Sequence, residues 1–155
     1  MSHSVFENPK LSVTTTPHDL GAFGFNMPVI ISNIPLDKNA PQAKSILVMA
    51  RIDTGTNVTA IDERLATELG LVSIKEDQMR TAGGMRTTRR YMANISFPNS
   101  SLKNYTLSVY DCKLPFNGNI ADLSSGNFSI LLGRDILANW KFVWDGPAAT
   151  MLISD

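Results

Sequence analysis

Short apolar runs rich in β-branched residues constrain the fold of this chain more than any other feature. The runs VIISNI at residues 29–34 and SILVMARI at residues 45–52 have the length of strands and are shorter than most helices. The segment between them, PLDKNAPQAK, contains turn-forming residues, which predicts a hairpin with a long loop. The chain therefore enters its core as β-structure.

Later segments repeat this pattern. Residues 78–97 offer two extended arms around Gly83 and Gly84, which predicts a projecting hairpin. Residues 101–112 alternate apolar and polar side chains, as a half-buried strand does. Residues 128–154 predict a strand, a short helix-like segment and a closing hairpin with the turn sequence Asp-Gly-Pro.

One short helix is predicted within DERLATELG, residues 62–70. Asp62 is a favourable N-cap residue, Leu65 and Leu69 lie on one helical face, and Gly70 supplies the stop. Many short strands with one or two short helices predict a mainly β domain, mainly antiparallel and either closed or sandwiched.

Composition fits one globular domain. The 155 residues are 43% hydrophobic and 18% charged, which is enough apolar surface for a core. Basic and acidic residues balance at fourteen each, so no global charge attracts nucleic acid or an anionic membrane. The N-terminus has no basic segment followed by an apolar run of signal-peptide length, and no segment has the length of a membrane span, so we expect a soluble, cytoplasmic protein. We expect an N-terminal arm over residues 1–24 and the domain over residues 25–155.

The residue inventory excludes several catalytic schemes. A serine or cysteine nucleophile needs a positioned imidazole, but both histidines, His3 and His18, lie near the N-terminus. Cys112 is the only cysteine, so the chain has neither a disulfide nor a tetrahedral metal set. No phosphate-binding loop is present, and we expect no metal and no cofactor. Carboxylate chemistry remains.

The tripeptide Asp53-Thr54-Gly55 directly follows the second apolar run. Burying an ionised carboxylate is costly, and an Asp-x-Gly sequence alone is usually only a turn. A second motif lies far downstream, where the apolar residues 130–132 lead into Gly133-Arg134-Asp135. The order of these two motifs is more informative than either motif alone.

An apolar strand into Asp-Thr-Gly, a glycine-bearing hairpin, and an apolar triplet into Gly-Arg-Asp resemble the retroviral-type aspartic proteases, the retropepsins. The likeness covers residues 27–154 and is strongest to stand-alone bacterial relatives and to the protease domain of eukaryotic DNA-damage-inducible shuttle proteins. It implies a closed β-barrel that is active as a two-fold homodimer. Among ten aspartates, only Asp53 lies in an Asp-[Ser/Thr]-Gly motif, so the resemblance implies that a second chain supplies the second carboxylate.

The resemblance also implies roles for individual residues. Asp53 is the catalytic carboxylate, Thr54 bonds across to the partner's loop, and Gly55 permits a tight loop. Gly133 packs behind this loop, and Arg134 donates to an acceptor that braces it. Many retroviral enzymes have an acid at the position of Asn57, so that acceptor is either the Asn57 carbonyl or another acid. The expected substrate-closing flap tip consists of Ala82, Gly83, Gly84 and Met85. The expected substrate is a peptide or protein in extended conformation.

Plainer interpretations stay open for several residues. Asp53 can be a turn residue, and Gly83-Gly84 can be a simple hairpin turn. Asp135 can cap the following helix or act as a second acid within the same chain. Two larger groups are also ambiguous: the arginines can form a solvated face or favour acidic substrates, and the methionines can line a binding surface or the core. These are Arg86, Arg89 and Arg90, and Met79, Met85 and Met92.

Two other functions are also compatible with the sequence. One is a non-catalytic peptide-binding or dimerisation module that keeps the retropepsin fold. The other is a processing enzyme that cuts only itself or one neighbouring protein.

Overall fold

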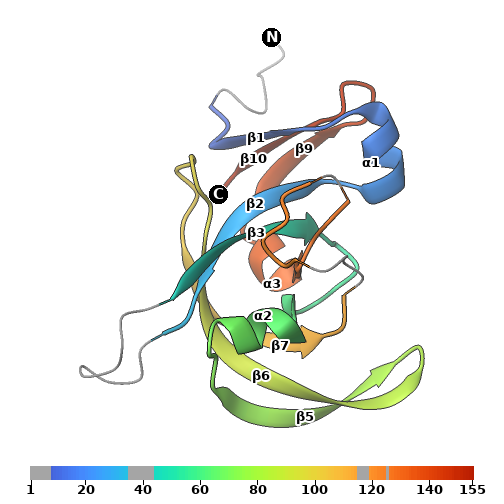
Figure 1. Ribbon diagram of the computed structural model, residues 1–155. Helices are drawn as coiled ribbons and strands as arrows, with labels where there is room; N and C mark the ends of the chain where they lie inside the picture. Colours follow the sequence, from blue (N-terminus) through green and yellow to red (C-terminus); the bar gives the residue numbers. More distant parts are fainter. Residues whose placement is uncertain (1–7, 35–43, 115–118, 125) are drawn as a thin grey trace.

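Six strands close on themselves into a barrel in the computed structural model, which describes residues 8–34, 44–114, 119–124 and 126–155 (Figure 1). The strand order is β2-β3-β8-β4-β7-β6-β5, and β2 also pairs with β6. This last pairing leaves only β5 outside the ring. The strands of this sheet are β2 (Asn26–Ser32), β3 (Ser45–Ile52), β4 (Ala60–Asp62), β5 (Ser73–Thr81), β6 (Gly84–Ser96), β7 (Tyr105–Cys112) and β8 (Ile130–Leu132). The predicted mainly β, closed fold is confirmed.

The barrel interior is built from alternating positions of these strands. In β2, Met27, Val29 and Ile31 are fully buried, and the residues between them are not. The same period of two places Val48 and Ala50 of β3 in the core. Most pairings are antiparallel, but β3–β8 and β4–β7 are parallel. The predicted hairpin of β2 and β3 has the expected antiparallel register.

A second, three-stranded antiparallel sheet lies beside the barrel with the order β1-β10-β9. Its strands are β1 (Leu11–Thr14), β9 (Lys141–Asp145) and β10 (Thr150–Ser154). The predicted closing hairpin is β9–β10, and the Ala148 N–H donates to the Asp145 carboxylate in its turn at 3.0 Å. β1 and β9 are the two edges of this sheet.

Three short helices complete the described fold: α1 (Pro17–Phe23), α2 (Glu63–Glu68) and α3 (Arg134–Leu137). α2 is the predicted helix, with Asp62 accepting from the Arg64 N–H at 2.9 Å and Gly70 following at φ 62°. α1 was not predicted, since the sequence indicates only an N-terminal arm over residues 1–24. Its start carries a local signal, because Thr16 accepts from the Asp19 N–H and proline occupies the first turn.

The hairpin of β5 and β6 curves away from the barrel (Figure 1). Thr81 pairs with Gly84, which leaves a two-residue turn at Ala82 and Gly83. Gly84 has φ 111°, a conformation that favours glycine. Ion pairs of Arg89 with Glu76 and of Arg90 with Asp77 link its two strands.

Among the described residues, no helix is long and apolar enough to cross a membrane.

Candidate active site

Asp53 lies directly after β3, where the chain leaves the barrel. Its N–H donates to the Leu132 carbonyl of β8 at 3.1 Å, which fixes the start of the loop. Its carboxylate Oδ1 accepts from the Gly55 N–H at 2.9 Å, and its carbonyl accepts from the Thr56 N–H at 3.3 Å. The half-buried carboxylate is therefore fixed at the start of a tight turn, and its oxygens can accept further hydrogen bonds.

The segment at the start of α3 braces this loop. The Arg134 N–H donates to the Thr56 carbonyl at 2.8 Å, and the Asp135 N–H donates to the Asn57 carbonyl at 3.2 Å. The Arg134 guanidinium donates from Nη1 to the Thr54 carbonyl at 2.8 Å. The acceptor for Arg134 is thus a main-chain carbonyl, which differs from both alternatives considered from the sequence. A backbone acceptor makes the brace independent of the side chain at residue 57.

Asp135 ties α3 to the end of the same loop, at Thr59 directly before β4. Its carboxylate accepts from the Thr59 N–H at 2.9 Å and from the Thr59 hydroxyl at 2.7 Å. It also accepts from its own neighbour, the Ile136 N–H, at 2.9 Å. The N-cap position of α3 is occupied by Gly133, so Asp135 is not the N-cap. These bonds account for a carboxylate in this motif without assigning it to catalysis.

Gly133 lies in closest contact with the loop. A Cβ at this position would lie 2.7 Å from the Val58 carbonyl carbon, 2.8 Å from Thr56 Cγ2 and 2.9 Å from the Thr59 nitrogen. Its φ of −91° is open to any residue, so the constraint is steric. The Gly133 N–H also donates to the Thr59 hydroxyl at 3.1 Å. The packing of Gly133 against the loop therefore has no room for a side chain.

A cavity of about 230 Å³ lies between the loop after Asp53 and the β5–β6 hairpin. The loop contributes Thr56, Asn57 and Val58, and the hairpin contributes Met79, Thr81, Arg86 and Thr88. Its remaining lining residues are Ala60, Tyr110, Asp111, Cys112, Leu114 and Leu131. The loop and the hairpin, which are far apart in the sequence, thus form one concave surface.

The four expected flap-tip residues lie outside this cavity. Ala82, Gly83, Gly84 and Met85 are exposed at the hairpin turn, and 64% of Met85 is accessible. Of the methionines, Met79 contributes to the cavity wall. The cavity is therefore lined by the stem of the hairpin.

The charged groups of the cavity are mostly engaged. Asp111 is buried and accepts from the Arg89 N–H at 2.9 Å and the Tyr91 hydroxyl at 3.3 Å. Arg86 lies 3.7 Å from Glu63 at the start of α2. Burial raises the pKa of the Cys112 thiol to about 12, and the charge of Asp62 adds to this shift. Cys112 is thus a neutral wall residue at physiological pH.

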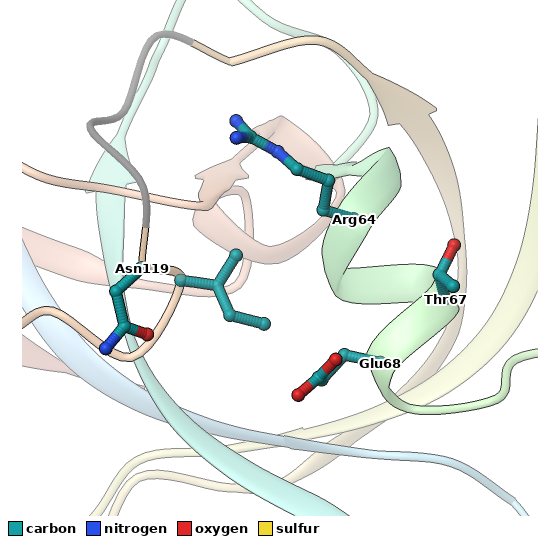
Figure 2. Close-up of a pocket in the computed structure, with 5 residues that line it drawn as sticks. Arg64, Thr67, Glu68 and Asn119 are labelled. Atoms are coloured by element: carbon teal, nitrogen blue, oxygen red, sulfur yellow. The ribbon is translucent and has the colours of Figure 1, made fainter.

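A larger cavity of about 440 Å³ lies beside α2 (Figure 2). Arg64, Thr67 and Glu68 line it from the helix, together with Asn119 and Ile120 from the segment after β7. None of these residues belongs to the loop after Asp53 or to the β5–β6 hairpin. Its size alone does not make it a catalytic centre, and its one acid has no neighbouring carboxylate in the lining. The described residues contain no group of His, Cys, Asp or Glu side chains suited to a metal ion.

Sequence reasoning missed two contributors to this region. The Thr59–Asp135 contact joins residues 76 positions apart, and no local sequence pattern predicts it. Arg51 was not identified, although the period of two along β3 places it on the face opposite the core residue Ala50, two positions before Asp53. That alternation was the available signal.

Residues 45–136 match the family model described as aspartyl protease. The matched segment contains both Asp53 and the Gly133-Arg134-Asp135 brace. No curated protein matches the sequence significantly.

Among solved structures, a retropepsin-like aspartic protease from Rickettsia conorii is similar, with a TM-score of 0.51 and 18% identity over 92% of this chain and 88% of that chain. The protease of simian foamy virus (mac) has a TM-score of 0.43 and 14% identity over 73% of this chain and 91% of that chain. The retroviral protease-like domain of Ddi1 from Leishmania major has a TM-score of 0.44 and 14% identity over 83% and 89%. The Rickettsia match identifies the fold.

Proposed function

Because this chain belongs to the aspartyl protease family and has the retropepsin-like fold, we propose that it is an aspartic endopeptidase with Asp53 as its catalytic residue. The observation that carries the proposal is the position of Asp53, directly after β3 in a loop that α3 braces and whose following residues, 56–58, line a cavity. Peptide hydrolysis by water needs a base for the water and an acid for the carbonyl oxygen and leaving nitrogen. Two facing carboxylates that share one proton supply both, as the aspartic proteases illustrate.

The second carboxylate comes from Asp53 of a second copy of the chain. The sequence has a single Asp-Thr-Gly motif, and the nearby Asp135 is engaged by Thr59 and Ile136. A two-fold axis beside the Asp53 loop brings the two side chains face to face. The proposed enzyme is therefore a homodimer whose active site is incomplete in one chain.

The edge of β9 is a suitable part of the dimer interface. Two consecutive residues of β9, Val143 and Trp144, point to opposite faces of the sheet and are 38% and 55% exposed. Trp144 packs edge-on against Phe25 with ring centroids 4.6 Å apart, and the Phe25 carbonyl accepts from the Ile52 N–H at 3.1 Å. Since Asp53 follows Ile52, this edge lies a few contacts from the catalytic loop. Pairing of the two β9 edges covers exposed apolar side chains and leaves the loops near the axis.

The neighbouring residues hold the loop and the substrate. Thr54 is exposed and bonds to the partner's loop, while Gly55 permits the close turn onto Asp53. Gly133 and Arg134 brace the loop from behind, and Asn57 supplies its carbonyl to this brace. The hairpin tip, Ala82 to Met85, closes over a substrate that lies as an extended strand along the floor. The cavity between loop and hairpin receives one of its side chains.

The proposal is tested by incubating the purified protein with a diverse peptide library and reading the products by mass spectrometry. Cleavage is expected to be strongest at mildly acidic pH, because ionisation of the second carboxylate depletes the shared-proton state. Asp53→Asn is expected to abolish it, and a metal chelator is expected to leave it intact. Cleavage that persists in the Asp53→Asn protein would contradict the proposal. Peptide binding without cleavage under any condition would favour a non-catalytic peptide-binding module.

A further inference from the structure

Arg51 lies near the end of β3, two positions before Asp53. Arg51 directly follows the core residue Ala50, so its side chain points to the opposite face of β3. In register, Arg51 neighbours Leu131 of β8, and Leu131 neighbours Ala60 of β4. Leu131 and Ala60 both line the cavity between the loop and the hairpin. Arg51 therefore extends the same row of side chains toward the catalytic aspartate.

The guanidinium of Arg51 is held in one orientation. Its Nε donates to the Asn26 carboxamide oxygen at 3.1 Å, across the β2–β3 pairing. Its central carbon lies 3.8 Å from the ring centroid of Phe128, a stacking contact that fixes the plane of the group. Phe128 is only 5% exposed but lies outside the main core cluster. Its ring thus serves as a platform for the arginine.

The two terminal nitrogens of Arg51 are left for another partner. Among the residues that the structure describes, neither nitrogen makes a hydrogen bond, and no carboxylate forms an ion pair with the guanidinium.

Burial lowers the pKa of Arg51. The negative charge of Asp53 opposes this shift, although its carboxylate forms no ion pair with the guanidinium. A half-buried cation with a fixed plane and two unused terminal nitrogens is matched to a carboxylate, which accepts two parallel hydrogen bonds.

We infer that Arg51 is a specificity-determining residue that binds a substrate carboxylate, so that the enzyme prefers peptides with an aspartate or glutamate close to the scissile bond. The inference rests on the proposed function. The recognised group is a side-chain carboxylate within about three residues of the cleaved bond, since Arg51 precedes Asp53 by two positions and an extended substrate advances by about 3.3 Å per residue.

The test compares matched peptides that carry Glu or Gln at each position around a site cleaved by the wild-type protein. We expect kcat/KM to be about tenfold to a hundredfold higher for Glu at one of these positions, the range of a charged hydrogen-bond contact. Arg51→Gln is expected to reduce this preference to about threefold or less, and Arg51→Lys is expected to keep part of it, because it retains the charge but not the fork.

Arg89→Gln is the matched control. Arg89 carries the same charge on the exposed face of the β5–β6 hairpin, where it pairs with Glu76. The Glu preference is expected to be unchanged in this variant. If the Glu preference is lost in Arg89→Gln but not in Arg51→Gln, the hairpin binds the substrate carboxylate and the inference is overturned.

Failure of the inference and failure of the proposed function give different results. Cleavage without a Glu preference, or with a preference that survives in Arg51→Gln, overturns the role of Arg51 alone. Absence of all cleavage refutes the proposed function, and Arg51 is then tested by binding of the same fluorescent Glu and Gln peptides. Tighter binding of the Glu peptide that disappears in Arg51→Gln supports the inference, and equal binding overturns it. Arg51→Lys repeats both comparisons if the glutamine variant does not fold.

Discussion

Replacing Gly133 with alanine is expected to destabilise the protein through a single methyl group. The added Cβ would lie 2.7–2.9 Å from Val58, Thr56 and Thr59, whereas carbon atoms in contact prefer about 3.5–4.0 Å. Two of these neighbours are main-chain atoms, so relief requires the loop itself to move by roughly 0.5–1 Å. Alanine adopts the observed φ of −91° without strain, which leaves overpacking as the only cost at this position.

Overpacking of this kind costs about 1–3 kcal/mol. For a chain of 155 residues this corresponds to a decrease in Tm of about 2–12 °C. Thermal unfolding followed by calorimetry at neutral pH measures the change. The cleavage rate is also expected to decrease, by up to a factor on the order of a hundred, because a displacement of about 1 Å in a catalytic loop has an effect of this size on rate.

Gly21→Ala is the matched control for this prediction. Gly21 lies within α1, and a Cβ there has no heavy atom within 4 Å. Alanine favours a helix over glycine by about 1 kcal/mol, so this variant is expected to melt at or above the wild-type temperature. If Gly133→Ala has the same Tm as the wild type and cleaves at the same rate, the steric explanation of the brace is refuted.

Three further perturbations follow from the same region. Asp135→Asn is expected to cost about 1–3 kcal/mol of unfolding free energy in urea titrations, since an amide nitrogen then faces the Thr59 donors, and an unchanged stability would contradict the bracing role. Burial opposes ionisation of Asp62, but hydrogen bonds from Arg64 and Leu114 outweigh it and lower its pKa. The ionised Asp62 therefore stabilises the fold above a pH of about 4, and this contribution is lost as the pH falls. In Asp62→Asn the free energy of unfolding should decrease less between neutral and acidic pH than in the wild type. An equal decrease in both proteins would contradict this prediction. Cys112, whose pKa is raised to about 12 by burial, should resist iodoacetamide at pH 8 in the native protein and react after unfolding, and rapid native labelling would count against its burial.

Much of the fold was predictable because its signals are local. The β-branched runs became β2 and β3, and the capping signal of Asp62 and Gly70 bounded α2. β4 was not predicted, because its three residues become a strand only through pairing with β7 and β8. Closure of the barrel by β2 and β6 is equally non-local, and it was expected from the family resemblance rather than from residue patterns.

The site was predictable where a motif carried it and unpredictable where packing did. The Asp53 and Gly133-Arg134 motifs identified the loop and its brace, although their catalytic roles stay predictions. The acceptor of Arg134 could not be read from side-chain identities, since it is the Thr54 carbonyl. The platform of Phe128 beneath Arg51 joins residues far apart in sequence, and only the folded chain brings them together.

The central claim, an active site shared between two chains, is tested most directly by mixing wild-type and Asp53→Asn protein. Equal amounts are refolded together so that chains pair at random, and cleavage of one peptide is measured at a concentration that keeps dimers intact. A mixed dimer lacks one of the two carboxylates, so the shared site predicts about a quarter of the activity of an all-wild-type sample at the same total protein concentration. Residual activity of about a half would instead mean that each chain works alone, and it would contradict the shared site.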